Sequence, residues 1–293
     1  MRKRFMYIST IAIAGLFAIF LFSNKDQTEE SIIFFPLDQS VLFTVASTTL
    51  TLIDEKDADE HILEWDSTSE LDREVYLRQD LSLLFADGRL KAKTSEWEDN
   101  SKKIAQYTKI TGEDSSHYVA VSYHHGEIHY DDQSKITSTQ KMSSDYLYVI
   151  DSSFSPLESF REPKKSTHKE WKHVLDHATE QNREFTVDKL VTHFNINRDD
   201  YNILPLSHIA NFNDATLFNM SKETSQQTIG KLWEGLYKNY FLGIKLEDGT
   251  IVDPIGSSEP HLFFHKDLSH ILILFETSEG TPVQLIQNLP TDR

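Results

Sequence analysis

An uncharged run of eighteen residues, Phe5 to Phe22, limits what the first segment of the chain can form. As an α-helix, such a run extends about 27 Å, which is close to the roughly 30 Å thickness of the hydrocarbon core of a membrane. Arg2, Lys3 and Arg4 precede it, and no acidic residue occurs before Asp26. We therefore predict that residues 1–25 form a single transmembrane helix whose contact with membrane lipid anchors the protein.

Two other interpretations of this run stay open, a cleaved signal peptide and a buried helix of a soluble fold. Signal peptides have a shorter apolar region, about 7–15 residues, which ends at two small residues separated by one position. Leu16 precedes Ala18 at that spacing, and Leu21 precedes Ser23, so neither pair is a good cleavage site. The basic residues favour a cytoplasmic N-terminus. The expected location is the cell membrane, with a single pass and most of the chain extracytoplasmic.

The rest of the chain is strongly acidic and lacks cysteine. The 268 residues after residue 25 carry 25 basic and 46 acidic side chains. This charge repels phosphate backbones, so we expect no nucleic-acid partner. The absence of cysteine excludes disulfides, thiolate metal ligands and cysteine nucleophiles.

Residues 26–151 are predicted to form a β-rich extracytoplasmic region with antiparallel strands. β-branched and apolar residues fill Val41–Ile53, and apolar residues alternate with polar ones in Ser143–Asp151. Asp87-Gly88 is a strong hairpin turn signal, and a second turn is predicted near His125-Gly126. The acidic segment Asp54–Glu60 is predicted to be a loop between strands. Strands joined by short turns indicate an antiparallel sheet.

Residues 152–166 contain two prolines and are predicted to be a linker. Residues 167–293 are predicted to be a mixed region of helices and hairpins, which forms either a separate unit or one domain with residues 26–151. The expected features are a capping box at Thr167 and Glu170, a helix with Trp171, Val174, Leu175 and Ala178 on one face, a second helix from Thr186, a third from near Ser221 to Gly243, and hairpins at Asp248-Gly249 and Glu279-Gly280. The predicted fold class is α+β.

The histidines give the clearest metal-ligand candidates. His173 and His177 lie four residues apart on a predicted helix, a spacing that lets two imidazoles bind one zinc ion. Zinc proteases of this pattern have Glu directly after the first histidine, where this chain has Val174. The two histidines also lie opposite the predicted apolar face, so a solvated helix face explains them more simply.

Two further groups of histidines are candidate sites. If residues 261–270 form a loop, the imidazoles of His261, His265 and His270 could converge on one site. If any part of the segment is a strand, alternation places His261 and His265 on one face and His270 on the other. The adjacent His124 and His125 would point to opposite sides of a strand, so both cannot line one site.

Linear motifs of catalysis are missing. The sequence has no nucleophile elbow and no phosphate-binding glycine loop, so the catalytic residues are unknown and no cofactor is expected. These observations favour a non-catalytic, membrane-anchored envelope protein that binds or regulates an unknown protein or peptide partner at the membrane surface, without excluding an enzyme. The alternative is a membrane-tethered envelope hydrolase that uses a metal ion through some of the histidines.

Overall fold

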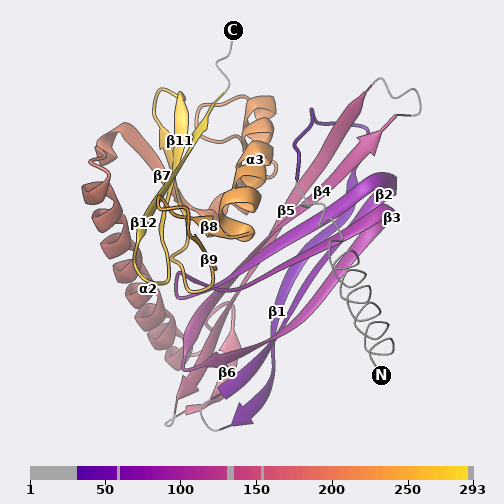
Figure 1. Ribbon diagram of the computed structural model, residues 1–293. Helices are drawn as coiled ribbons and strands as arrows, with labels where there is room; N and C mark the ends of the chain where they lie inside the picture. Colours follow the sequence, from indigo (N-terminus) through magenta and orange to yellow (C-terminus); the bar gives the residue numbers. More distant parts are fainter. Residues whose placement is uncertain (1–31, 58–59, 131–134, 153–154, 290–293) are drawn as a thin grey trace, which may run out of the picture. The chain divides into compact units, whose positions relative to one another are not determined.

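Alternating strand residues and short turns build a large antiparallel sheet from the first half of the chain (Figure 1). The computed structural model describes residues 32–57, 60–130, 135–152 and 155–289. Within these ranges the sheet consists of β1 (Phe43–Asp57), β2 (Glu60–Ala86), β3 (Arg89–Glu113), β4 (Ser116–His129), β5 (Ile136–Ser152) and β6 (Ser155–Phe160). Its order is β1-β2-β4-β5-β6, and β3 pairs with β2. The confirmed fold class is a strand-rich, antiparallel α+β fold.

Strand β2 connects two parts of this sheet. Its first half pairs with β1 and its second half pairs with β4, while β3 runs along both halves. A register irregularity separates the halves between Glu70 and Val75. Leu63 and Trp65 of the first half share a buried core with Leu84 of the second half. The two halves of β2 therefore bury their apolar side chains in a common interior.

Side chains connect β1 to β5 where no strand ladder joins them. The Leu50 amide donates to Asp145 Oδ2 at 2.7 Å, and Arg161 Nη2 donates to the Leu50 carbonyl at 2.8 Å. Arg161 Nε also donates to Asp145 Oδ1 at 2.8 Å. This ion pair satisfies backbone groups that a neighbouring strand would otherwise pair. We call Leu50, Asp145 and Arg161 the β1–β5 seam.

The second half of the chain forms a smaller sheet flanked by helices. Its elements are α2 (Ser166–His193), β7 (Tyr201–Pro205), α3 (Lys222–Leu236), β8 (Ile244–Lys245), β9 (Ile251–Val252), β10 (His261–His265), β11 (His270–Glu276) and β12 (Pro282–Asn288), with short helical segments at Arg198–Asp200, Leu206–Phe212 and Tyr237–Phe241. The described four-stranded sheet has the order β12-β11-β10-β7, and β8 pairs with β9.

Helices α2 and α3 cover opposite faces of the small sheet (Figure 1). Val187 and Leu190 of α2 pack against Phe263 of β10 in one buried cluster. Trp233 of α3 also contacts the large sheet, since its ring stacks on Tyr123 with centroids 5.2 Å apart. Helix α3 thus lies between the two sheets, which belong to one compact unit that begins at residue 33.

Several predicted elements are confirmed by the structure. Asp87 and Gly88 both have positive φ in the turn between β2 and β3. The turns at Asp248-Gly249 and Glu279-Gly280 join β8 to β9 and β11 to β12. Ser221 is the N-cap of α3, and its hydroxyl accepts a hydrogen bond from the Thr224 amide at 3.0 Å. Local turn and cap chemistry was sufficient at these positions.

Two predictions in the large sheet are wrong. His125 and Gly126 lie inside β4, where they pair with Gln140 and Thr139 of β5. A Cβ at Gly126 would lie 3.2 Å from Leu71 Cδ1, so this glycine serves close packing and not a turn. The acidic segment Asp54–Glu60 is mostly strand, because β1 continues to Asp57 and β2 begins at Glu60.

Three predictions for α2 also require correction. The helix is continuous from Ser166 to His193, so no second helix starts at Thr186, and no glycine or proline lies between these ends to interrupt it. Its N-cap is Lys165 without a side-chain cap bond, so the capping box at Thr167 is not formed. Val174 is 54 % exposed, because the buried stripe of the helix runs through Leu175 and Thr179.

The structure describes the segment predicted as a linker but not the segment predicted as a membrane anchor. The anchor predicted at residues 1–25 lies outside the described residues. Within the described part of the chain, no helix combines the length and apolar character needed to cross a membrane. In the segment predicted as a linker, residues 152–166, Ser155–Phe160 forms β6 and pairs with β5.

Candidate functional site

A chain of polar side chains occupies the interior of the large sheet. His124 Nδ1 lies 2.6 Å from Asp80 Oδ2, and His124 Nε2 lies 2.8 Å from Ser143 Oγ. The other carboxylate oxygen of Asp80, Oδ1, accepts a hydrogen bond from Arg78 Nη2 at 3.3 Å. Strand alternation accounts for the grouping, since Arg78 and Asp80 are two residues apart on β2 and His124 lies opposite Asp80 on β4.

This Asp–His–Ser arrangement resembles a nucleophilic triad in order, but its contacts are those of a structural network. Asp80 and His124 are fully buried, and Ser143 Oγ is also 2.6 Å from Thr48 Oγ1. Arg78 is fully buried too, and it donates further to the Lys102 carbonyl at 2.9 Å. Ser143 is partly buried, and its hydroxyl is shared between His124 and Thr48, so the bonds of the network join side chains of β1, β2, β4 and β5. We therefore assign the network to the stability of the sheet.

The predicted metal ligands His173 and His177 lie side by side on the exposed surface of α2. Their ring centroids are 6.2 Å apart. Among the residues that the structure describes, no group of three His, Cys, Asp or Glu side chains is placed to hold a metal ion. A metal site at this pair stays a prediction.

The hairpin between β10 and β11 places two of the other candidate histidines side by side. His261 and His265 share a face of β10, as alternation predicts, but His270 lies beside His265 with ring centroids 5.0 Å apart. The prediction that His270 faces the other way is wrong, because residues 266–269 form a turn that brings His270 opposite His265. His124 and His125 point to opposite sides of β4, as expected: His124 bonds Asp80, and His125 Nε2 lies 3.1 Å from Ser138 Oγ.

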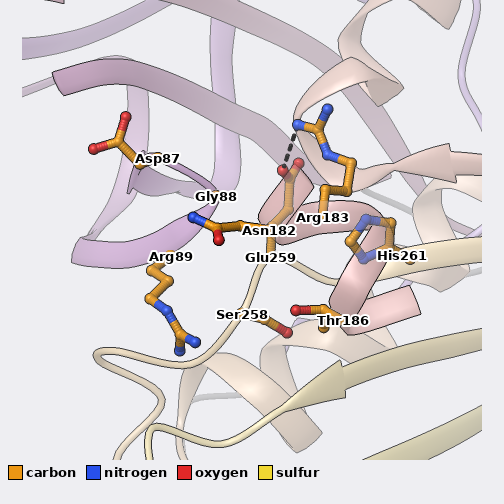
Figure 2. Close-up of a pocket in the computed structure, with 9 residues that line it drawn as sticks. All are labelled: Asp87, Gly88, Arg89, Asn182, Arg183, Thr186, Ser258, Glu259 and His261. Carbon is orange, nitrogen blue, oxygen red and sulfur yellow. Dashed lines mark hydrogen bonds and ion pairs between the residues drawn. The ribbon is translucent and has the colours of Figure 1, made fainter. Parts of the chain in front are cut away.

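A small cavity lies where the β2–β3 turn meets α2 and the segment leading into β10 (Figure 2). Its volume is about 20 Å³, and its lining residues are Asp87, Gly88, Arg89, Asn182, Arg183, Thr186, Ser258, Glu259 and His261. Backbone bonds fix the junction, since the Glu259 amide donates to the Gly88 carbonyl at 2.8 Å and the Leu90 amide donates to the Ser257 carbonyl at 2.9 Å. We call this the β2–β3 turn cavity.

A larger apolar groove lies between α3 and strand β12. Its volume is about 300 Å³, and its walls are Lys231, Leu232, Glu234, Gly235, Leu236, Lys238, Asn239, Ile273, Leu285, Ile286 and Gln287. Strand β12 is at the end of the four-stranded sheet, so no described strand pairs with its outer edge. Ile286 is 63 % exposed at this edge. We call this feature the α3–β12 groove.

Packing within the chain explains one of the two glycines of α3 but not the other. A Cβ at Gly230 would lie 2.1 Å from Phe34 Cδ2, so packing within the chain requires that glycine. A Cβ at Gly235 would meet nothing within 4 Å. Glycine in a helix interior costs about 0.5–1 kcal/mol relative to alanine, and nothing in the described chain offsets that cost at Gly235. Gly235 lines the groove and leaves its wall open to a close approach.

The sequence carried a signal for the groove but none for the cavity. Val283–Asn288 is an uncharged run after a hairpin turn, which is unusual for an edge strand. The cavity brings together three segments that are about 90 and about 70 residues apart along the chain, and spacing cannot reveal such a grouping.

The fold and these two features define a strand-rich α+β protein with a surface groove and a small polar cavity. No protein-family model matches the chain, and no curated protein matches it.

Proposed function

We propose that the protein is a membrane-anchored, extracytoplasmic, non-catalytic protein of the cell envelope, and that it binds an extended segment of a partner protein at the membrane surface. The observation that carries the proposal is the uncharged free edge of β12 beside the α3–β12 groove. The predicted anchor at residues 1–25 supports the location.

The free edge of β12 suits pairing with another strand. Exposed edge strands in soluble proteins usually carry a charge, a central proline or a bulge that prevents such pairing. Strand β12 begins with Pro282, but from Val283 to Asn288 there is no charged residue and no further proline, and the register with β11 has no irregularity. An extended segment that adds to β12 would bond its backbone to this edge and place alternate side chains in the groove.

Charge indicates what kind of segment the groove accepts. Lys231 and Lys238 lie on its rim, and Lys238 pairs with Glu234 at 2.8 Å. In the described part of the chain no acidic side chain forms an ion pair with Lys231. The net charge of the protein is −17, so a second copy of the chain would be repelled as a partner. The occupant we expect is an apolar extended segment that carries an acidic residue, from a different protein.

Binding of synthetic peptides tests this proposal directly. Two labelled heptapeptides, Val-Thr-Val-Glu-Val-Thr-Val and the same sequence with Lys in place of Glu, are titrated with the full-length protein in nanodiscs. We expect the Glu peptide to bind about five- to tenfold more tightly by fluorescence polarisation, because it meets the rim lysines. Lys231→Glu should reverse the preference, since it replaces attraction of the acidic residue by repulsion.

A matched pair of variants locates the binding. Ile286→Lys places a charge on the β12 edge and should weaken binding of the Glu peptide at least about tenfold. The control is Ile251→Lys on β9, where the isoleucine is 69 % exposed and does not line the groove. Equal binding by both variants, or no difference between the Glu and Lys peptides, would refute the proposal.

A further inference from the structure

Residues 33–38 are bound to the large sheet ahead of β1. The Phe35 amide donates to Ser138 Oγ at 3.0 Å, and the Asp38 amide donates to the Ser138 carbonyl at 2.7 Å. In return, the Ser138 amide donates to the Pro36 carbonyl at 3.0 Å. Because Ser138 belongs to β5, these bonds fix the segment to the sheet. We call residues 33–38 the docked segment.

Phe34 joins the docked segment to α3. A Cβ at Gly230 would lie 2.1 Å from Phe34 Cδ2, so the half-buried phenylalanine ring packs directly on the backbone of the helix. One turn further along α3, Glu234 Oε2 accepts a hydrogen bond from the Phe34 amide at 3.2 Å. Gly230 and Glu234 are four residues apart and share a face of the helix, so the ring and the amide of Phe34 contact the same face.

Glu234 belongs both to this contact and to the α3–β12 groove. Its other carboxylate oxygen, Oε1, pairs with Lys238 Nζ at 2.8 Å, and both side chains line the groove. Lys231 also lines the groove, three residues before Glu234, which is a spacing at which side chains of opposite charge pair on a helix. The hydrogen bond from the Phe34 amide and the ion pair with Lys238 direct the Glu234 carboxylate away from Lys231.

We propose that the docked segment sets the charge preference of the groove by positioning Glu234. The inference rests on the proposed function and adds Phe34 as a residue that determines which partner segment binds. While the segment is docked, Lys231 is available to an acidic residue of the partner. When the segment is released, Glu234 pairs with Lys231 and weakens that attraction. The docked segment follows the predicted anchor at residues 1–25, so the choice of partner depends on the chain that leads to the membrane.

A double-mutant cycle on Phe34 and Glu234 tests the proposal. The Glu and Lys heptapeptides are titrated by fluorescence polarisation against the full-length protein in nanodiscs. Phe34→Ala removes the ring that packs on Gly230 and should lower the preference for the Glu peptide about two- to fivefold, which is the effect of one exposed ion pair. The control is Ile33→Ala, at a neighbouring side chain that is 46 % exposed, and it should keep the wild-type preference.

The Glu234→Gln background separates positioning from a general loss of structure. Glutamine keeps an oxygen that accepts a hydrogen bond from the Phe34 amide, but it has no charge with which to pair with Lys231. In this background Phe34→Ala should leave the peptide preference unchanged. Equal losses of preference in both backgrounds, or no loss in Phe34→Ala alone, would overturn the inference and leave the proposed function standing. A wild type that shows no preference would refute the proposed function, and the inference with it.

Amide hydrogen exchange of the wild type guards against a Phe34→Ala protein that does not fold. Bound Glu peptide occupies Lys231 and leaves Glu234 with the Phe34 amide, so by the reciprocity of coupled equilibria it should slow exchange of that amide about two- to fivefold. Bound Lys peptide should not slow it. The Asp87 amide, which donates to the His117 carbonyl at 3.0 Å, serves as the control and should exchange equally with either peptide. Equal exchange of the Phe34 amide with the two peptides would overturn the inference without any variant.

Discussion

Replacement of Asp80 by alanine should lower the free energy of unfolding by about 3–5 kcal/mol. The change leaves the guanidinium of Arg78, which is fully buried, without its carboxylate partner, and it removes the partner of His124. Burial lowers the pKa of Arg78, and the charge of Asp80 opposes that effect. Urea denaturation followed by circular dichroism measures the loss.

The matched control for this change is Asp66→Ala, on the same strand. Asp66 is only partly buried, and burial together with Glu64 raises its pKa, so its negative charge is not stabilised by a partner. We expect a change within about 0.5 kcal/mol for the control. A stably folded Asp80→Ala protein would contradict the structural role of the network and reopen its interpretation as a catalytic triad.

Acidification should destabilise the protein between about pH 6.5 and pH 4, and His125 is one of the groups responsible. Its ring is buried, and burial followed by the charge of Arg78 lowers its pKa to about 4. In the unfolded chain a histidine titrates near its ordinary pKa of about 6.5, so the unfolded state takes up the proton first. Stability is therefore fully present above about pH 6.5 and declines by about 1.4 kcal/mol per pH unit as the pH falls towards 4.

His117 should add to the same trend, since burial also lowers its pKa to about 4. Urea titrations at a series of pH values measure the slope. His125→Gln cannot take up a proton and should reduce the slope by about 1.4 kcal/mol per pH unit, whereas His177→Gln on the exposed face of α2 should leave it unchanged. An unaltered slope in His125→Gln would assign the acid sensitivity to other groups.

Turns and helix caps could be predicted from neighbouring residues, whereas the tertiary contacts of strands and helices could not. The turn at Asp87-Gly88 and the N-cap at Ser221 depend on neighbouring residues, and both are confirmed. The prediction of a turn at Gly126 is wrong because the real constraint on this glycine, the close approach of Thr139 and Leu71 from neighbouring strands, is not local. The length of α2 was misjudged for a similar reason, since its buried stripe follows tertiary contacts and not a regular apolar repeat.

Candidate sites were harder to predict because they combine distant segments. Strand alternation correctly separated His124 from His125, but it could not indicate that His124 meets Asp80 across a strand pair. It also misplaced His270, whose position depends on the path of a turn. The sequence could not predict the α3–β12 groove, because the open space that a Cβ at Gly235 would face depends on the tertiary structure.

In the β1–β5 seam, side-chain bonds that include an ion pair connect two strands of the large sheet that no backbone ladder joins. A ladder of backbone bonds holds β1 to β2, whereas side chains join the facing edge to β5: the ion pair between Arg161 and Asp145 with its two bonds to Leu50, and the hydroxyl bond between Thr48 and Ser143. Salt weakens exposed ion pairs far more than backbone ladders. Tension applied from the N-terminal end of the chain would therefore open this joint before the ladder, and it would do so more readily at high ionic strength.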